Sequence, residues 1–395
     1  MKINDLIFKN LKDELKNREN TVKSILKNSD RKTTLVLGAG ISCSAGLPGW
    51  DNLISELCYL VLATDFWEEI HGNGNLPDAY VEDSLKYINS SISEFEKFNN
   101  IFLKSSLLEI GEYLSVVSYF PVKKINKESD SDVSKGIINA LIKMVLTNNR
   151  EYKEMMGLCN CEHCSCCNNK NQDCIINRSI GKLAKLIIEQ NLNCNVVTYN
   201  YDNLFEYCLQ KICSQNNLFE SLYDEAKATS QYKIHVNHPH GYLNITDMKD
   251  NSGKIIKDSR KCILTESSYY EIERYQYCWE NQVVANALND GTCVFFGFSG
   301  TDYNFKRILN NIKSESDGKD SNHFIIVAID DTVNSLDDFD EKCDRKLPGE
   351  GISMESKVLL HRSLAMKELY WRKKNILPIW TTIEELPALI ERISH

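Results

Sequence analysis

The sequence lacks both a long hydrophobic run and an excess of basic residues. No apolar stretch approaches the roughly 18 residues that a membrane helix needs. Residues 1–30 are rich in Lys, Asn and Glu and lack the apolar core of a signal peptide. The formal net charge of −9 implies no strongly basic face, which argues against a general nucleic-acid binder. These absences favour a cytoplasmic protein with no membrane and no direct nucleic-acid partner.

Strand-like and helix-like segments alternate along the 395 residues. Short apolar runs, mostly rich in β-branched or aromatic residues, predict strands at 34–37, 194–198, 262–264, 292–297, 324–329 and 375–380. Helical patterns are expected at 50–62, 203–213, 269–288, 304–312, 356–374 and 383–393. This alternation predicts an α/β protein with a doubly wound, Rossmann-like parallel sheet. Ligands bind such sheets at the carboxyl ends of the strands.

The pattern also predicts a division of the chain into parts. Residues 1–31 have helical apolar spacing, and 32–63 together with 191–395 carry the strands of the Rossmann-like domain. Residues 64–190 are mostly helical in pattern and contain no convincing strand. We expect them to form a helical insertion, which is either a structural subdomain or a lid over the ligand cleft.

A glycine-rich turn follows the first predicted strand. Gly38 and Gly40 allow a tight turn and a close approach to a ligand, and N–H groups at the next helix start bind phosphates. The spacing is not the usual dinucleotide fingerprint, because Gly46 comes six residues after Gly40. No phosphate-binding lysine follows the turn, which disfavours ATP hydrolysis. The turn alone indicates only a nucleotide-binding α/β protein.

Three later loops carry polar residues at or near strand ends. They are Thr198-Tyr199-Asn200-Tyr201-Asp202, His238-Pro239-His240-Gly241 and Gly297-Phe298-Ser299-Gly300-Thr301-Asp302. Each loop taken singly has a structural interpretation as a helix cap or a turn. Their order after the glycine-rich turn is more specific than any one of them.

The order of these four motifs resembles the sirtuin family. The resemblance covers roughly residues 33–60 and 194–310 with the final strand and helix, and it is closer to the bacterial sirtuin-like NAD hydrolases of anti-phage defence than to protein deacylases. Where deacylases continue with Pro-Asp-Phe-Arg, this chain has Pro48-Gly49-Trp50-Asp51. Deacylases also carry two Cys-x-x-Cys pairs after the His-Gly motif, whereas residues 242–292 contain only Cys262 and Cys278.

The resemblance implies NAD⁺ as substrate and assigns roles to individual residues. Asn200 resembles the residue that holds a water or a ribose hydroxyl, and His240 resembles the base, with His238 a nearby rival and His235 a weaker one. Asp202 braces the ribose or holds its loop as a cap. The remaining expected NAD⁺ contacts are Gly38, Ala39, Gly40 and Ser42 at the pyrophosphate and Gly297, Ser299 and Asp302 around the adenosine.

The reaction implied is hydrolysis of NAD⁺ to ADP-ribose and nicotinamide, which would deplete NAD⁺ during phage infection. By the same resemblance, control would come from homo-oligomer formation, an activating nucleotide or a defence-system partner protein. Two alternatives remain open. One is a sirtuin-type deacylase or ADP-ribosyltransferase, and the other is a non-enzymatic sensor that binds NAD⁺ or ADP-ribose.

The cysteines form a second unusual feature. Six of the fifteen, together with His163, lie within residues 159–174. Cys161 and Cys164 have the spacing of metal ligands, and Cys167 or Cys174 could complete a structural zinc site. A reduced flexible loop and a redox switch are the alternatives. A catalytic metal is not expected, because the sirtuin-like reaction needs none.

Overall fold

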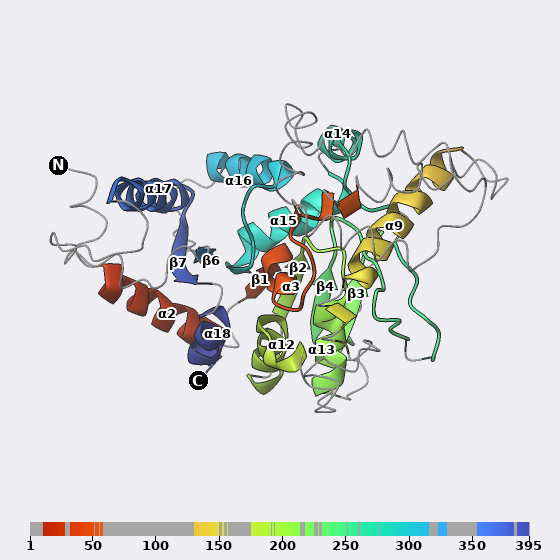
Figure 1. Ribbon diagram of the computed structural model, residues 1–395, viewed down its shortest axis with the longest axis horizontal. Coiled ribbons are helices and arrows are strands. Elements are labelled where there is room, and N and C mark those ends of the chain that lie inside the picture. The colour runs from red at the N-terminus through yellow and green to blue at the C-terminus, as the bar shows by residue number, and fades with distance from the viewer. Residues whose placement is uncertain are drawn as a thin grey trace.

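A computed structural model gives the architecture of the chain (Figure 1). It describes residues 11–27, 32–50, 52–54, 56–57, 130–149, 152–153, 156, 175–190, 192, 194–213, 218–224, 228, 231–250, 252–259, 261–275, 277–315, 323–329, 354–382 and 385–394. A sheet lies at its centre with helices on both faces.

The sheet described here has seven strands in the order β3-β4-β2-β1-β5-β6-β7, and every neighbouring pair is parallel. The strands are β1 (Thr33–Leu37), β2 (Cys194–Thr198), β3 (Phe219–Leu222), β4 (Ile234–Asn237), β5 (Thr292–Phe296), β6 (His323–Ile329) and β7 (Ile376–Thr382). On one side of β1 the strands β5, β6 and β7 follow in chain order, and on the other side β4 lies between β2 and the edge strand β3. The doubly wound α/β fold predicted from the sequence is therefore confirmed.

The strand order reverses between β1 and β5, which are direct neighbours. Successive connections leave this point toward opposite edges of the sheet, so the loops after β1 and β5 diverge. Such a topological switch point is where open α/β sheets bind ligands. The glycine-rich turn and the Gly297–Asp302 loop both begin there.

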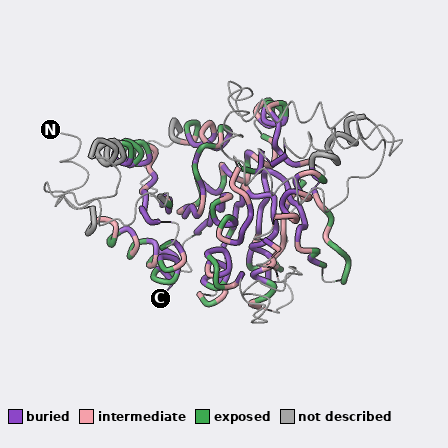
Figure 2. The backbone as a smooth tube through the Cα atoms, viewed as in Figure 1, coloured by how far each residue is buried: buried purple, intermediate pink, exposed green. Residues whose placement is uncertain are grey.

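Two apolar cores cover the two faces of the sheet. Alternate side chains of one strand point to opposite faces, so Leu35 and Leu37 join one core and Val36 joins the other. The first core includes residues of α2 (Leu11–Lys27), α12 (Ser179–Glu189), α13 (Leu204–Ile212) and α18 (Leu386–Ser394). The second includes residues of α15 (Trp279–Asp290), α16 (Tyr303–Glu315) and α17 (Met354–Lys373). Figure 2 shows the buried strands between these layers.

A buried ionic network holds α2 against the C-terminal part of the sheet. Arg18 of α2 donates to Glu368 of α17 at 2.7 Å, and both side chains are almost fully buried. The Trp380 indole of β7 donates to the second oxygen of Glu368 at 2.7 Å, and Arg18 also contacts the carbonyl of Pro378. Segments from the two ends of the chain are therefore joined in one cluster. No helix in the described ranges is long and apolar enough to span a membrane.

Three details of the predicted strands were wrong or incomplete. Residues 262–264 are buried but form no strand. Their backbone lies beside the histidine loop, where the Ile263 N–H donates to the His240 carbonyl at 2.9 Å. The short strands β3 and β4 were not predicted, because four-residue runs that contain Glu, Ser, His and Asn show little apolar contrast.

The helix predicted over 269–288 is two helices. α14 (Glu266–Arg274) begins at Thr265, whose side chain accepts from the Ser268 N–H, and α15 begins after Cys278. Neither proline nor glycine marks the break, so the sequence pattern did not reveal it. The glycine-rich turn also contains a short helix that was not predicted, α3 (Ala39–Cys43). Of the helix expected at 50–62, residues 50, 52–54, 56 and 57 are described and are helical.

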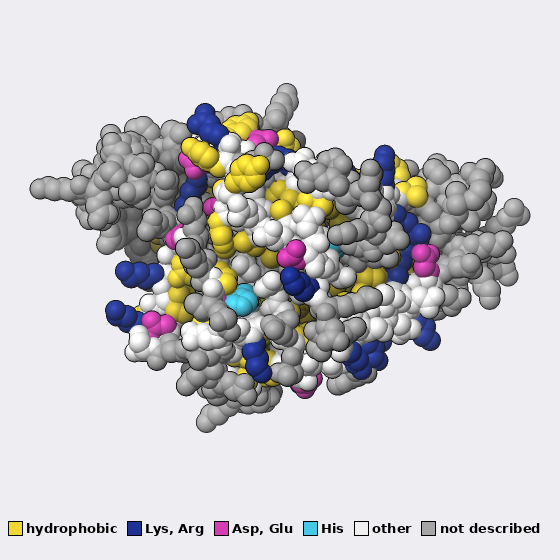
Figure 3. Space-filling model, turned by 180° about the vertical axis from the view of Figure 1, so that it is seen from behind, with side chains coloured by type: hydrophobic (Ala, Val, Ile, Leu, Met, Phe, Trp, Pro, Cys, Tyr) yellow, Lys and Arg dark blue, Asp and Glu magenta, His cyan; other side chains and the backbone are white. Residues whose placement is uncertain are grey.

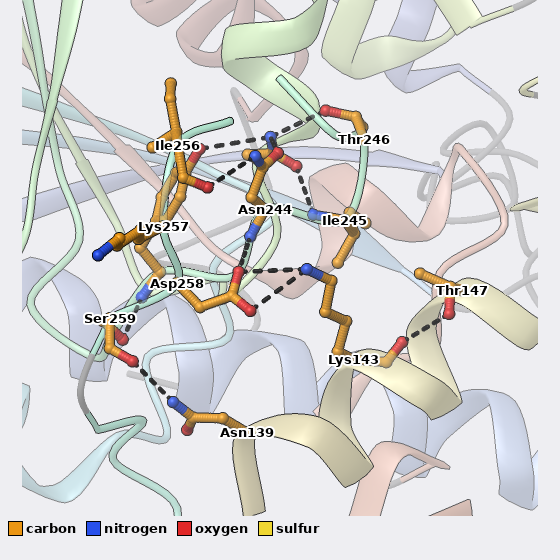
Figure 4. A network of polar contacts seen from close by, with 12 residues as sticks. Asn139, Lys143, Thr147, Asn244, Ile245, Thr246, Ile256, Lys257, Asp258 and Ser259 are labelled. Carbon is orange, nitrogen blue, oxygen red and sulfur yellow. Dashed lines mark hydrogen bonds and ion pairs between the residues drawn. The ribbon is translucent and has the colours of Figure 1, made fainter. Parts of the chain in front are cut away.

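The described part of residues 64–190 is helical and contains no strand. It comprises α9 (Asp130–Asn148), the short helix η1 (Ile175–Asn177) and α12, which packs against α13 and α18. Figure 4 shows how α9 is attached to the segment that follows the histidine loop. Asn139 donates to the Ser259 carbonyl at 2.8 Å, and Lys143 pairs with Asp258 at 3.2 Å. The division of the chain into domains stays a prediction.

Candidate functional site

The glycine-rich turn packs directly on the loop after β5. Gly38 N–H donates to the Phe296 carbonyl at 3.0 Å, and Gly40 N–H donates to the Gly297 carbonyl at 2.9 Å. A Cβ at Gly38 would lie 2.5 Å from the Gly297 oxygen, closer than such atoms ever approach. The glycines are therefore required by contact between two loops. Of the turn residues predicted to bind pyrophosphate, Ala39 keeps an N–H without an acceptor in the described structure.

Ser42, Asn200 and Asp202 form one hydrogen-bonded cluster at the carboxyl ends of β1 and β2. Asn200 Nδ2 donates to Ser42 Oγ at 2.9 Å, and Ser42 Oγ donates to Asp202 Oδ1 at 3.2 Å. The same Asp202 oxygen accepts the Leu204 N–H at 3.1 Å at the start of α13. All three side chains of the cluster are buried. The structure thus brings these three predicted site residues together, while the N-cap residue of α13 is Asn203, next to Asp202.

Burial changes the acidity of the cluster. Loss of solvent raises the pKa of Asp202 from 3.8 to about 6, although the Leu204 N–H and the Ser42 hydroxyl partly offset this rise. At neutral pH the Asp202 carboxyl is therefore close to the midpoint of its titration.

His240 lies near this cluster in a tight turn after β4. Gly241 has φ of +103°, which favours glycine, and this conformation carries the chain away from the histidine. The His240 ring packs edge-on against Tyr199, with ring centroids 4.7 Å apart. Burial lowers the pKa of His240, although Asp302 and Glu280 oppose this effect. The imidazole is therefore neutral near pH 7, the state that a general base needs.

The two rival histidines make different contacts. His238 is buried, with Nε2 2.7 Å from Glu206 Oε1 and Nδ1 3.3 Å from the Asn200 carbonyl. Both of its ring nitrogens are therefore occupied, which leaves neither free to accept a proton from a ligand. His235 lies on β4 and contacts Glu220 at 2.7 Å. His240 alone of the three forms no ring hydrogen bond with a described residue.

Four buried side-chain atoms of this region have no hydrogen-bond partner among the described residues: the Tyr199 hydroxyl, Glu206 Oε2, Asn200 Oδ1 and His240 Nε2. The last two, Asn200 Oδ1 and His240 Nε2, belong to the predicted catalytic residues. An unsatisfied buried acceptor or donor costs about 1–3 kcal/mol, so such atoms are uncommon in folded proteins. Both lie at the carboxyl-end edge of the sheet beside its switch point. Their placement suits a ligand that supplies the missing hydrogen bonds.

Ser299 and Asp302 lie on the loop after β5 and were both predicted to surround the adenosine, but their surroundings differ. Ser299 is exposed, and its hydroxyl lies 2.7 Å from the hydroxyl of Thr301. Asp302 was predicted near the adenosine, but its Oδ2 lies 3.7 Å from His240 Nε2. The other oxygen, Oδ1, accepts the Phe305 N–H at 2.6 Å at the start of α16. Asp302 is therefore placed beside the histidine.

A broad cavity of about 1200 Å³ flanks the other side of the histidine loop. Pro239 and Gly241 line it together with three exposed tyrosines at α14, Tyr270, Tyr275 and Tyr277. Hydrophobic side chains gather at the upper edge of the back face, where α14 lies (Figure 3). Ser42, Asn200, Asp202 and His240 do not line this cavity. The polar cluster, rather than this cavity, therefore defines the candidate site.

Sequence reasoning missed two residues that touch the predicted ones. The sequence pattern places Glu206 within a predicted helix and Tyr269 at the start of another, and assigns neither a role in a site. Neither belongs to a recognisable motif, and each gains its contact from a partner at least 32 positions away. The cysteine-rich stretch 159–174 lies outside the described residues. Within the described residues, no group of His, Cys, Asp and Glu is arranged to hold a metal ion.

Comparison with known proteins connects this site to one family. A family model described as "SIR2-like domain" matches residues 195–347. The match takes in Asn200, His240 and Asp302 and does not extend to the glycine-rich turn. It supports a sirtuin-like family and fits the NAD-related chemistry of an NAD-utilising enzyme. No curated protein matches the chain.

Proposed function

We propose that this protein hydrolyses the nicotinamide–ribose bond of NAD⁺ to give ADP-ribose and nicotinamide. The observation that carries the proposal is the buried pair of unsatisfied atoms, Asn200 Oδ1 and His240 Nε2, at the switch point of the sheet. The SIR2-like match over the same residues supports NAD⁺ as the ligand. The Ser42 hydroxyl, the Ala39 N–H and the loops at Gly38, Gly40, Gly297 and Ser299 are the proposed dinucleotide contacts.

The chemistry requires little acid catalysis. The glycosidic C–N bond breaks and its electron pair stays on nicotinamide, which leaves as a neutral molecule. A new bond forms between C1′ and the oxygen of water, and the water loses one proton. We assign Asn200 to hold the water or a ribose hydroxyl. Its Nδ2 donates to Ser42 Oγ, and its Oδ1 accepts no hydrogen bond from a described residue. We assign His240 to accept the proton, because its ring is buried, neutral and not hydrogen-bonded to any described residue.

We further propose that the reaction serves anti-phage defence by depleting NAD⁺, following the sequence resemblance. Constant activity would harm the host cell, so control by a homo-oligomer, a partner protein or an activating nucleotide belongs to this proposal. A structural zinc ion at Cys161, Cys164, Cys167 and Cys174 stays a sequence prediction. Zinc content below roughly 0.2 equivalents in protein purified under reducing conditions would exclude it.

The test is nicotinamide release from NAD⁺ by the purified full-length chain, with and without an acyl-lysine peptide. We expect release without peptide and a loss of at least about 100-fold in His240→Ala, the usual contribution of a general base. We expect Asn200→Ala to lower nicotinamide release by a similar factor. His235→Ala is the matched control, because this histidine contacts Glu220 and lies outside the cluster, and it should retain activity within about twofold.

Other outcomes select the alternatives. Release that depends on the acyl peptide would indicate a deacylase. Binding of NAD⁺ without turnover, equal in wild type and His240→Ala, would indicate a sensor. The purified chain would also be inactive if an activator were missing. The NAD⁺ level should therefore also be measured in phage-challenged cells that express wild type or His240→Ala. An equal NAD⁺ level in both would refute the defence role.

A further inference from the structure

His240 has one acidic neighbour in direct reach. Asp302 Oδ2 lies 3.7 Å from His240 Nε2, and the two side chains are 11% and 6% exposed. The charged groups that face His240 are Asp302 and Glu280, and the rings of Tyr199 and Tyr269 pack against it. At this separation, a carboxylate in a water-poor site interacts strongly with a charged imidazole and little with a neutral one.

A third residue holds the carboxylate in place. The Tyr269 hydroxyl donates to Asp302 Oδ2 at 2.8 Å, on the oxygen that approaches His240. The ring of Tyr269 also packs edge-on against His240, with ring centroids 5.6 Å apart. The second oxygen of Asp302 is bound by the Phe305 N–H at the start of α16. Both oxygens of Asp302 are thus held, and its position relative to His240 is set by two separate helices.

We infer that Asp302 and Tyr269 are positioning residues for His240, and that Asp302 stabilises the imidazolium formed when His240 accepts a proton. The effect of Asp302 on catalysis rests on the proposed hydrolysis of NAD⁺. The pairing of Asp302 with His240 rests on the geometry alone. At 3.7 Å Asp302 makes no hydrogen bond to His240, so it acts on the imidazolium through its charge. In this arrangement Asp302 acts through the histidine and not on the adenosine ribose.

The first test does not depend on activity. Asp302→Asn removes the charge but keeps an oxygen to accept the Phe305 N–H, so α16 retains its cap. The eight histidines are labelled with ¹⁵N and titrated by NMR, with the His240 signal identified by its loss in His240→Gln. We expect the pKa of His240 to fall by about 1–3 units in Asp302→Asn, the usual effect of losing a close opposite charge. Glu280→Gln, which removes a second and less influential charge, should give a smaller fall.

The second test separates positioning from ribose binding. We expect kcat for NAD⁺ to fall at least about tenfold in Asp302→Asn while KM stays within twofold, because only the charged transition state loses an interaction. Tyr269→Phe should lower kcat less, and the double variant should be no worse than Asp302→Asn alone, because Tyr269 acts through the carboxylate.

An unchanged His240 titration in Asp302→Asn would overturn the inference, and so would a rise in KM with kcat retained. Additive losses in the double variant would overturn the part assigned to Tyr269. If wild type cleaves no NAD⁺, the proposed function fails, but the titration still decides whether the Asp302–His240 pair exists.

Discussion

The buried carboxylate of Asp202 provides a quantitative prediction, because its ionisation opposes folding. Burial raises its pKa from 3.8 to about 6. A shift of about two units corresponds to roughly 3 kcal/mol, since each unit is worth about 1.4 kcal/mol. Replacement by Asn removes the charge and keeps an oxygen for the Leu204 N–H and the Ser42 hydroxyl. We therefore expect Asp202→Asn to be more stable than wild type at pH 7.5, by up to about 3 kcal/mol.

The sign of the pH dependence follows from the raised pKa. Below pH 3.8 the carboxyl is protonated in both the folded and the unfolded states, so Asp202 adds no penalty. Above pH 6 it is ionised in both states, and the folded state bears the full cost of burying the charge. The stability advantage of the variant should therefore appear as the pH rises between these two values and stay constant above them.

The assay is urea unfolding at a series of pH values from 4 to 7.5, with the unfolding free energies of the two proteins compared. Asp290→Asn is the matched control, because this carboxylate is 61% exposed and pairs with an exposed lysine at 3.7 Å. It should change stability by a few tenths of a kcal/mol at every pH. If Asp202→Asn is less stable than wild type at pH 7.5, or if its stability advantage does not vary with pH, then burial of the Asp202 charge does not oppose folding.

Two further substitutions test the packing around the site. Gly38→Ala should destabilise the fold by about 3 kcal/mol in urea unfolding, because its Cβ would meet backbone atoms of Gly297 and Phe298 at 2.5 and 2.6 Å. Gly49→Ala is its control, since that Cβ would meet only a sulfur at 3.7 Å, and equal losses would contradict this account. Tyr199→Phe should stabilise the fold by about 1 kcal/mol, because it removes a buried hydroxyl that has no partner among the described residues and lies beside an apolar cavity of about 10 Å³. A loss of stability there would reveal a hydrogen bond to the hydroxyl.

Local patterns in the sequence predicted much of the fold. The five longest strands and the glycine-rich turn were recognisable because a buried parallel strand is a compact apolar run that ends abruptly. The four-residue strands β3 and β4 escaped recognition, because their apolar residues are too few to stand out. The break between α14 and α15 also escaped, since no proline or glycine marks it. These features depend on neighbours distant in the chain.

The amino-acid sequence settled which residues are available for chemistry: a glycine-rich turn, an Asn-x-Asp loop and a Gly-x-Ser loop, each after a recognisable strand, and a His-Gly loop. How these four loops meet depends on the tertiary structure. Ser42 reaches Asn200 across 158 positions because β1 and β2 are neighbours in the sheet. His238 is occupied by Glu206, while His240 faces Asp302 without a hydrogen bond. Whether a ring nitrogen is free depends on which groups surround it, and that is a property of non-local packing.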